Sequence, residues 1–195
     1  MPTAAPFRYV GFETDGHRYI LEDGRQVPSI TQMLKRCGYI DDRFHTEDAS
    51  QRGTTVHQLC ADFDLGALDP NGCTTLYRGY LMAHVQAMSI LRPTWTHIEE
   101  PMISQDGCWA GMPDRVGTLS GLACVLDIKS GGAEAWHPLQ LALQAILVAP
   151  ETHLPPEVIA RFGLLLKANG RFKLEHYDNR RDFDKARTII RQCCG

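Results

Sequence analysis

The sequence predicts an α/β fold in which a mixed central β-sheet is flanked by helices. Three strand-like segments joined by short turns, residues 97–104, 109–119 and 122–129, predict an antiparallel meander. A helical segment over residues 138–149 separates them from two further strand-like segments, an order that is typical of an α/β sandwich. With 195 residues and 44% hydrophobic content, the chain can bury the core of a single domain.

Residues 1–28 are expected to form an N-terminal β-hairpin. Residues 7–28 alternate apolar and polar side chains, and two Asp-Gly dipeptides supply turns between strands. Ser29 then caps a short helix over residues 30–37, which Gly38 ends.

Two longer helices precede the meander. Apolar residues recur at helical spacing within residues 47–65, and Gly66 closes that helix. A second helix is expected over residues 76–91, before Pro93. In the meander itself, Asp-Gly and Ser-Gly dipeptides stand in the two gaps where hairpin turns belong.

The helix after the meander has a clear start and end in the sequence. Pro138 suits its first position, and the helix is expected to end at residue 149 because Pro150 follows. The remaining elements are expected in the order strand 159–166, strand 171–177 and helix 183–193.

The net charge of −3 is unevenly distributed along the chain. Residues 161–195 hold nine Lys and Arg residues against four acidic ones, whereas the remainder hold eleven against nineteen. The basic C-terminal segment, residues 160–195, could therefore meet a polyanion such as DNA, while the acidic remainder could hold a metal ion. An ordinary solvated helix face is the alternative for the basic segment.

Targeting and redox signals are absent from the sequence. No apolar run approaches the roughly 20 residues that span a bilayer, and the first eight residues lack a basic region followed by an apolar stretch. The seven cysteines are odd in number and show no Cys-x-x-Cys. We therefore expect a soluble, cytoplasmic protein with reduced, mostly buried thiols and no membrane partner.

The predicted chemistry depends on Asp114, Asp127 and Lys129. Strand alternation places Asp127 and Lys129 on one face and sends the intervening Ile128 into the core. A hairpin between the second and third strands of the meander would set Asp114 close to Asp127. Two carboxylates and one ammonium are then expected in one place.

This combination suits hydrolysis of a phosphodiester. Two neighbouring carboxylates repel each other unless a cation lies between them, and hard oxygen ligands favour Mg²⁺ or Mn²⁺ over zinc. A lysine beside them can orient the attacking water or neutralise charge that develops on a phosphoryl oxygen. An ordinary ion pair on a half-exposed strand is the alternative for the same three residues.

Several motifs follow one another in a specific order: Arg52-Gly53-Thr54-Thr55-Val56-His57, Gly111-Met112-Pro113-Asp114, Val125-Leu126-Asp127-Ile128-Lys129-Ser130-Gly131, and Gln140. Together they resemble the PD-(D/E)XK nuclease superfamily, in particular its RecB-like, phage-exonuclease-like branch. The resemblance covers roughly residues 28–150. It implies a restriction-endonuclease-like core and a Mg²⁺-dependent DNA nuclease, with an exonuclease of DNA end processing or recombination favoured.

The resemblance also implies metal ligands. Asp114, Asp127 and the carbonyl of Ile128 would hold one or two magnesium or manganese ions, and His57 would be an additional ligand or organiser of the site. Taken alone, His57 would be an ordinary packed or solvated histidine. Relatives often carry a glutamate in the strand before the first aspartate; alternation sends only one of Glu99 and Glu100 inward, with a slight preference for Glu100, and a structural ion pair is the alternative for both.

The remaining catalytic roles follow from the same resemblance. Lys129 would position the attacking water, Gln140 would steady Lys129 or a phosphate, and the product would carry a 5′-phosphate. Where the family has a tyrosine this chain has Gln144, which shares a helix face with Gln140 and could still bond DNA or the site. The stacking role of that tyrosine is therefore in doubt here.

DNA would be held mainly through its phosphates. The side chains expected to do so are Arg52, Arg115, Lys167, Arg171 and Lys173. Trp109 or Trp136 could stack on an unpaired base, although core packing is the better expectation for either. Some superfamily members bind an iron–sulphur cluster through four cysteines, but Cys37 and the adjacent Cys193 and Cys194 leave too few ligands at workable spacing, so none is expected.

Two other functions remain open from the sequence. One is a catalytically silent DNA- or protein-binding module of the same fold, and the other is an unrelated metal-dependent hydrolase of small phosphoesters. A homo-oligomer that threads DNA and a recombination partner protein are both compatible with the resemblance. Exonuclease or endonuclease action, polarity, strand preference and pathway are not encoded in these motifs.

Overall fold

A mixed five-stranded sheet lies at the centre of the computed structural model, which describes residues 9–13, 18–41 and 46–195. The strand order is β10-β9-β8-β7-β4, in which β8 and β9 are parallel and the other neighbours are antiparallel. The predicted α/β class with a mixed sheet is therefore confirmed. The bounds are β4 (Thr94–Ile98), β7 (Arg115–Leu119), β8 (Leu122–Lys129), β9 (Ala160–Leu166) and β10 (Phe172–His176).

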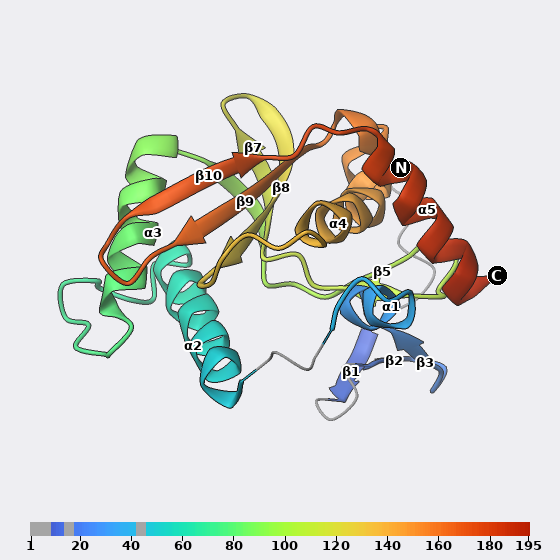
Figure 1. Ribbon diagram of the computed structural model, residues 1–195, viewed down its shortest axis with the longest axis horizontal. Coiled ribbons are helices and arrows are strands. Elements are labelled where there is room, and N and C mark those ends of the chain that lie inside the picture. Colours follow the sequence, from blue (N-terminus) through green and yellow to red (C-terminus); the bar gives the residue numbers. More distant parts are fainter. Residues whose placement is uncertain (1–8, 14–17, 42–45) are drawn as a thin grey trace.

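Helices cover both faces of this sheet (Figure 1). One face packs against α2 (Glu47–Asp64) and α3 (Arg78–Leu91). The other packs against α1 (Ile30–Arg36), α4 (His137–Thr152) and α5 (Arg181–Cys194), with a short 3₁₀ helix, η2 (Pro156–Val158), before β9. None of the helices in the described part of the chain has the length and apolar character needed to cross a bilayer.

Strand β8 is buried on both faces, and its alternation decides on which face Asp127 and Lys129 lie. Leu126 and Ile128 enter the core beneath α2 and α3, whereas Val125 enters the core beneath α4. Because side chains alternate along a strand, Asp127 and Lys129 lie on the α4 face. Ile128 points into the core, as predicted.

The β7–β8 hairpin has the predicted two-residue turn. Ser120 and Gly121, between the paired Leu119 and Leu122, both have positive φ, of 51° and 80°. This is the backbone of a type I′ turn. The register pairs Arg115 with Leu126. Asp114, one residue before β7, therefore lies opposite Asp127, as expected from the predicted hairpin.

The expected long strands of the meander are interrupted. Residues 97–104 divide into the end of β4 and a short β5 (Met102–Ile103), and residues 109–119 divide into β6 (Ala110–Gly111) and β7. Strands β5 and β6 pair with each other in a separate ribbon. The breaks fall at Pro101 and Pro113, because proline has no N–H to donate to a strand partner.

The N-terminal region holds a third strand beyond the expected hairpin. β1 (Tyr9–Glu13), β2 (Arg18–Leu21) and β3 (Gln26–Pro28) form an antiparallel sheet, with Gly24 at φ 81° in its second turn. The first expected Asp-Gly turn lies outside the described residues. Tyr19, Leu21 and Val27 cluster with Ala110 of β6, so this sheet packs against the β5–β6 ribbon.

The helix ends agree with the sequence at α1 but not at α4. The Ser29 hydroxyl accepts from the Gln32 N–H, and Gly38 has φ 76° just after the helix. The prediction that Pro150 lies beyond α4 is wrong, because the helix continues to Thr152 with Pro150 in its last turn. There the missing N–H removes a single helical hydrogen bond.

Gly117 allows β4 to approach β7 closely where β4 bulges between Trp95 and His97. A Cβ atom at residue 117 would lie 2.0 Å from the carbonyl oxygen of Thr94. We expect Gly117→Ala to lower the free energy of unfolding by about 2 kcal/mol or more. Chemical denaturation would measure this, and Gly132→Ala, whose Cβ would meet no atom within 4 Å, should change stability by less than about 0.5 kcal/mol. Equal effects of the two substitutions would contradict the close approach.

Candidate functional site

Three side chains from separate segments converge beside the start of β7. His57 of α2, Glu99 after β4 and Asp114 before β7 place one ligand atom each within 4.8 Å of one another. The Nδ1 atom of His57 lies 3.3 Å from Glu99 Oε1 and 3.5 Å from Asp114 Oδ2. An imidazole and two carboxylates form a set that can bind a divalent cation.

Asp114 is held against β8 by the backbone. The N–H of Ile128 donates to Asp114 Oδ2 over 2.6 Å, and the Asp114 side chain is only 8% exposed. This hydrogen bond fixes the Asp114 carboxylate near the carboxyl end of β8, next to Asp127. The sequence-predicted approach of Asp114 to Asp127 therefore takes place through Ile128.

Asp127 and Lys129 form the second half of the site on the α4 face. Lys129 Nζ lies 2.5 Å from Asp127 Oδ2 and donates to Gln140 Oε1 over 3.0 Å. Gln144, one turn further along α4, donates from Nε2 to Asp127 Oδ1 over 3.4 Å. Both glutamines of the helix motif therefore reach the site residues, with Gln140 on the lysine and Gln144 on the aspartate.

Glu99, not Glu100, belongs to the site. Glu100 is exposed, whereas Glu99 contacts His57, so the preference for Glu100 is wrong. The β-bulge in β4 shifts the register, and Glu99 itself has a left-handed backbone with φ 51°. Simple alternation from the strand ahead does not hold across such a break.

The electrostatics of the cluster favour a cation. Burial raises the pKa of Asp114 to about 7; the positive charge of His57 opposes this, while the charges of Asp127 and Glu99 add to it. Burial lowers the pKa of His57, but the carboxylates of Asp114 and Glu99 outweigh it and raise the pKa to about 9. Without an ion, the site therefore holds protons that a cation would replace.

The donor atoms of these residues suit a hard divalent ion. Asp127 Oδ2 is buried, and the ammonium of Lys129 is its ion-pair partner. Three carboxylates and one imidazole supply mostly oxygen donors, which magnesium and manganese prefer. A zinc site of thiolates and histidines would have a different donor set.

Arg115 does not lie where the sequence placed it. Its side chain is fully buried, and its guanidinium bonds Asp64, Glu99 and the main chain of Asp114. The prediction that Arg115 follows a phosphate backbone is therefore wrong, because the group has no exposed surface to offer. Its neighbour Asp64, at the end of α2, was not predicted, although it lies two helical turns after His57 on the same face.

The other predicted DNA-binding residues lie on α2 and on the β9–β10 hairpin. Lys167 is exposed, and its Nζ donates to the carbonyl of Gly131, in the loop after Lys129. Arg171 is also exposed, and Lys173 is exposed but paired with Glu175. Arg52 is partly buried, with an Nε atom that has no partner.

The two tryptophans differ in their surroundings. Trp109 is 2% exposed and belongs to the core, which confirms the expected core packing for this residue. Trp136 is partly exposed at the start of α4, with Lys129 Nζ 5.0 Å from its ring centroid. A cation over the ring face stabilises the lysine in place.

The seven cysteines are all free thiols. Burial raises the pKa of Cys60 and Cys124, so these thiols stay protonated within the core. Cys37 and Cys193 are close, with 3.9 Å between their sulphur atoms. The absence of an iron–sulphur cluster stays a prediction.

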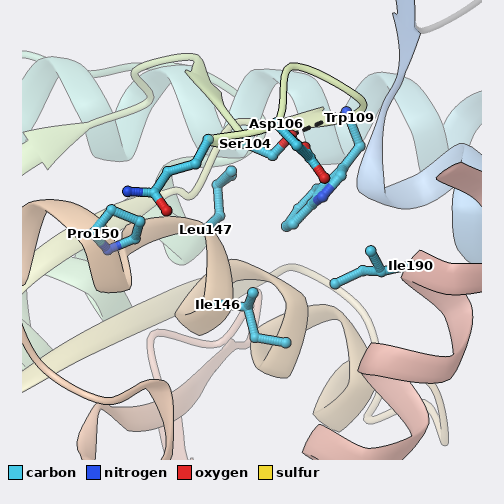
Figure 2. Close-up of a pocket in the computed structure, with 8 residues that line it drawn as sticks. Ser104, Asp106, Trp109, Ile146, Leu147, Pro150 and Ile190 are labelled. Carbon is cyan, nitrogen blue, oxygen red and sulfur yellow. Dashed lines mark hydrogen bonds between the residues drawn. The ribbon is translucent and has the colours of Figure 1, made fainter. Parts of the chain in front are cut away.

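A separate hollow of about 280 Å³ lies between α4, α5 and the β5–β6 ribbon (Figure 2). Ile146, Leu147 and Ile190 form its apolar side, and Ser104 donates to Asp106 at its rim. It contains none of the predicted catalytic residues. The predicted catalytic residues lie instead in the cluster around β8.

Comparison with known proteins adds no assignment. The sequence matches no protein-family profile, and it matches no curated protein.

Proposed function

We propose that this protein is a Mg²⁺-dependent DNA nuclease with a restriction-endonuclease-like core of the PD-(D/E)XK type. The main support is one observation: the His57, Glu99 and Asp114 cluster adjoins the Asp127–Lys129 pair at the carboxyl end of β8. The motif order along the chain and the contacts of both α4 glutamines agree with this proposal.

The ligands for one or two magnesium ions would be His57, Glu99, Asp114, Asp127 and the carbonyl of Ile128. When bound, the ion supplies Lewis-acid stabilisation of the phosphoryl oxygens. The role of His57 and Glu99 is to complete the donor set beyond the two aspartates. Their partial exposure, 28% and 21% of the side chains, leaves this side of the site open to a substrate.

Lys129 would stabilise the transition state. Its ammonium is held between Asp127 and Gln140, so it needs little reorganisation when negative charge develops on the phosphoryl group. Gln140 orients the lysine, and Gln144 orients the carboxylate of Asp127. In this superfamily the product carries a 5′-phosphate, and we propose the same outcome here.

DNA would approach from the exposed side of the loop after Lys129. Lys167 touches that loop, and Arg171 follows it across the β9–β10 turn. Both side chains are exposed and positively charged, which suits contacts to phosphate without base reading. A basic edge of this kind favours a polynucleotide over a small phosphoester.

Digestion of end-labelled linear DNA beside covalently closed circular DNA tests the proposal. We expect Mg²⁺-dependent loss of linear DNA that stops with chelator and in Asp127→Asn; survival of the circles would identify an exonuclease. Binding of DNA without cleavage under every condition would favour the silent binding module, and cleavage of small phosphoesters alone would favour the other hydrolase.

Stabilisation by the cation should increase with pH. The pKa values of Asp114 and His57 are raised to about 7 and about 9 from reference values of 3.8 and 6.5. Their protons stabilise the ion-free fold below the reference values, and this contribution is lost as the pH rises through 7 and then 9. At about pH 9 a cation meets fewer competing protons than at about pH 6.

Thermal unfolding with and without Mg²⁺ measures this effect. The rise in Tm on adding Mg²⁺ is expected to be larger at the higher pH. A rise that is equal at both pH values, or larger at the lower one, would contradict proton displacement at the site.

A further inference from the structure

A chain of buried ionisable groups leads from the interior to the candidate metal site. Asp64 accepts a hydrogen bond from Arg115 Nε over 2.7 Å and contacts His84 Nε2 at 2.9 Å. The side chains of Arg115 and His84 are 0% exposed, and that of Asp64 is 4% exposed. Burying so many ionisable groups is unfavourable unless each is paired, and Asp64 is the common partner here.

The other end of Arg115 touches two candidate ligand residues. Its Nη1 atom donates to the main-chain carbonyl of Asp114 over 2.6 Å and to Glu99 Oε1 over 3.4 Å. The same Glu99 oxygen contacts His57. One guanidinium therefore holds the backbone of one ligand and the carboxylate of another.

Glu99 needs such support because of its position. It follows the bulged strand β4, and its φ of 51° is in the left-handed region, which a glutamate seldom adopts. Its N–H donates to the carbonyl of Asp114, the acceptor that Arg115 also uses. Arg115 thus anchors the loop that carries Glu99 as well as its carboxylate.

We propose that Arg115 is a positioning residue of the metal site, oriented by Asp64 and His84. It sets Glu99 and Asp114 in the arrangement that a divalent cation requires, and it contacts neither the cation nor DNA. This inference rests on the proposed metal-dependent function, because it concerns the same site. The planar guanidinium reaches its three acceptors at once, which the single ammonium of a lysine does not.

Arg161 supplies a matched control in the same fold. It is also buried and bonds a carboxylate and main-chain carbonyls, those of Asp182, Pro138 and Asn179. None of these partners is a candidate metal ligand. Arg161→Lys should therefore destabilise the fold as Arg115→Lys does, without altering the metal site.

Titration calorimetry with Mn²⁺ alone tests the proposal, with Tm measured on each ion-free protein. We expect both lysine variants to lower Tm, and we expect Arg115→Lys to weaken Mn²⁺ binding by about 10-fold or more. Arg161→Lys should bind Mn²⁺ as the wild type does. Should Arg115→Lys fail to fold, Asp64→Asn preserves the shape of the partner and is expected to weaken binding by about 3-fold or more.

Two results would overturn the proposal, and they are distinguishable. If the wild type binds Mn²⁺ and the Arg115→Lys or Asp64→Asn protein binds it equally well, the buried chain is only structural and the proposed function stands. If the folded wild type does not bind Mn²⁺, the metal site itself is wrong and both proposals fail.

Discussion

Replacing Lys129 by alanine is expected to lower the rate of DNA hydrolysis by about 10²–10³-fold or more. The ammonium lies between Asp127 and Gln140, and its contact with the Trp136 ring further restricts it. A preorganised charge of this kind acts on the transition state rather than on the bound substrate. The loss should therefore appear in kcat, with little change in DNA binding.

A comparison of single-turnover rates and DNA affinity measures this prediction. Lys35→Ala, on α1, is the matched control, because it removes one lysine charge away from the site. Cleavage by Lys129→Ala at more than about a tenth of the wild-type rate would show that the lysine has no direct role in the transition state.

Asp114→Asn is expected to lower the affinity for Mn²⁺ and to raise the stability of the ion-free protein. Loss of a ligand carboxylate should weaken Mn²⁺ binding by at least about 100-fold, more than loss of a group that only supports a ligand. The raised pKa of Asp114 shows that the fold disfavours its charge. Since Asn carries none and can still accept from the Ile128 N–H, the ion-free variant should be more stable above pH 7, by about 2 kcal/mol.

Calorimetry and chemical denaturation at about pH 8 measure the two quantities on the same samples. Asp69→Asn, at an exposed position whose carboxylate accepts from the Asn71 N–H, should leave both unchanged. A variant that loses stability while keeping its affinity for Mn²⁺ would show that Asp114 is a structural carboxylate rather than a ligand.

The parts of the site that the sequence predicted are those set by local periodicity. Alternation along β8 places Asp127 and Lys129 together, and the two-residue turn sets the register that brings Asp114 beside them. Helical spacing likewise puts Gln140 and Gln144 on one face of α4. Each of these relations spans a few residues or one hairpin.

Glu99 shows where periodicity fails. The bulge between Trp95 and His97 and the left-handed backbone at Glu99 interrupt the alternation just before the site. That stretch contains no glycine, the residue that would have indicated a bulge or a left-handed backbone. The choice between Glu99 and Glu100 therefore needed the three-dimensional register.

Arg115 was misassigned for a different reason. An arginine next to a predicted metal ligand in a DNA-binding protein is reasonably expected to contact phosphate. Its actual partner, Asp64, comes from another helix, 51 positions earlier. Which charges share a buried pair is a property of tertiary packing, and strand or helix patterns do not contain it.

The segments that carry the proposed metal ligands are far apart along the chain, and this separation also affects folding kinetics. His57, Glu99, Asp114 and Asp127 come from a helix, a loop and a hairpin, and β8 meets its parallel neighbour β9 only across α4. Contacts between distant segments form late, because loop-closure entropy opposes them. A cation held by all four groups, as proposed, would bind only the completed fold, so it would slow unfolding without accelerating folding. The lifetime of the folded molecule would then be the quantity that such an ion controls.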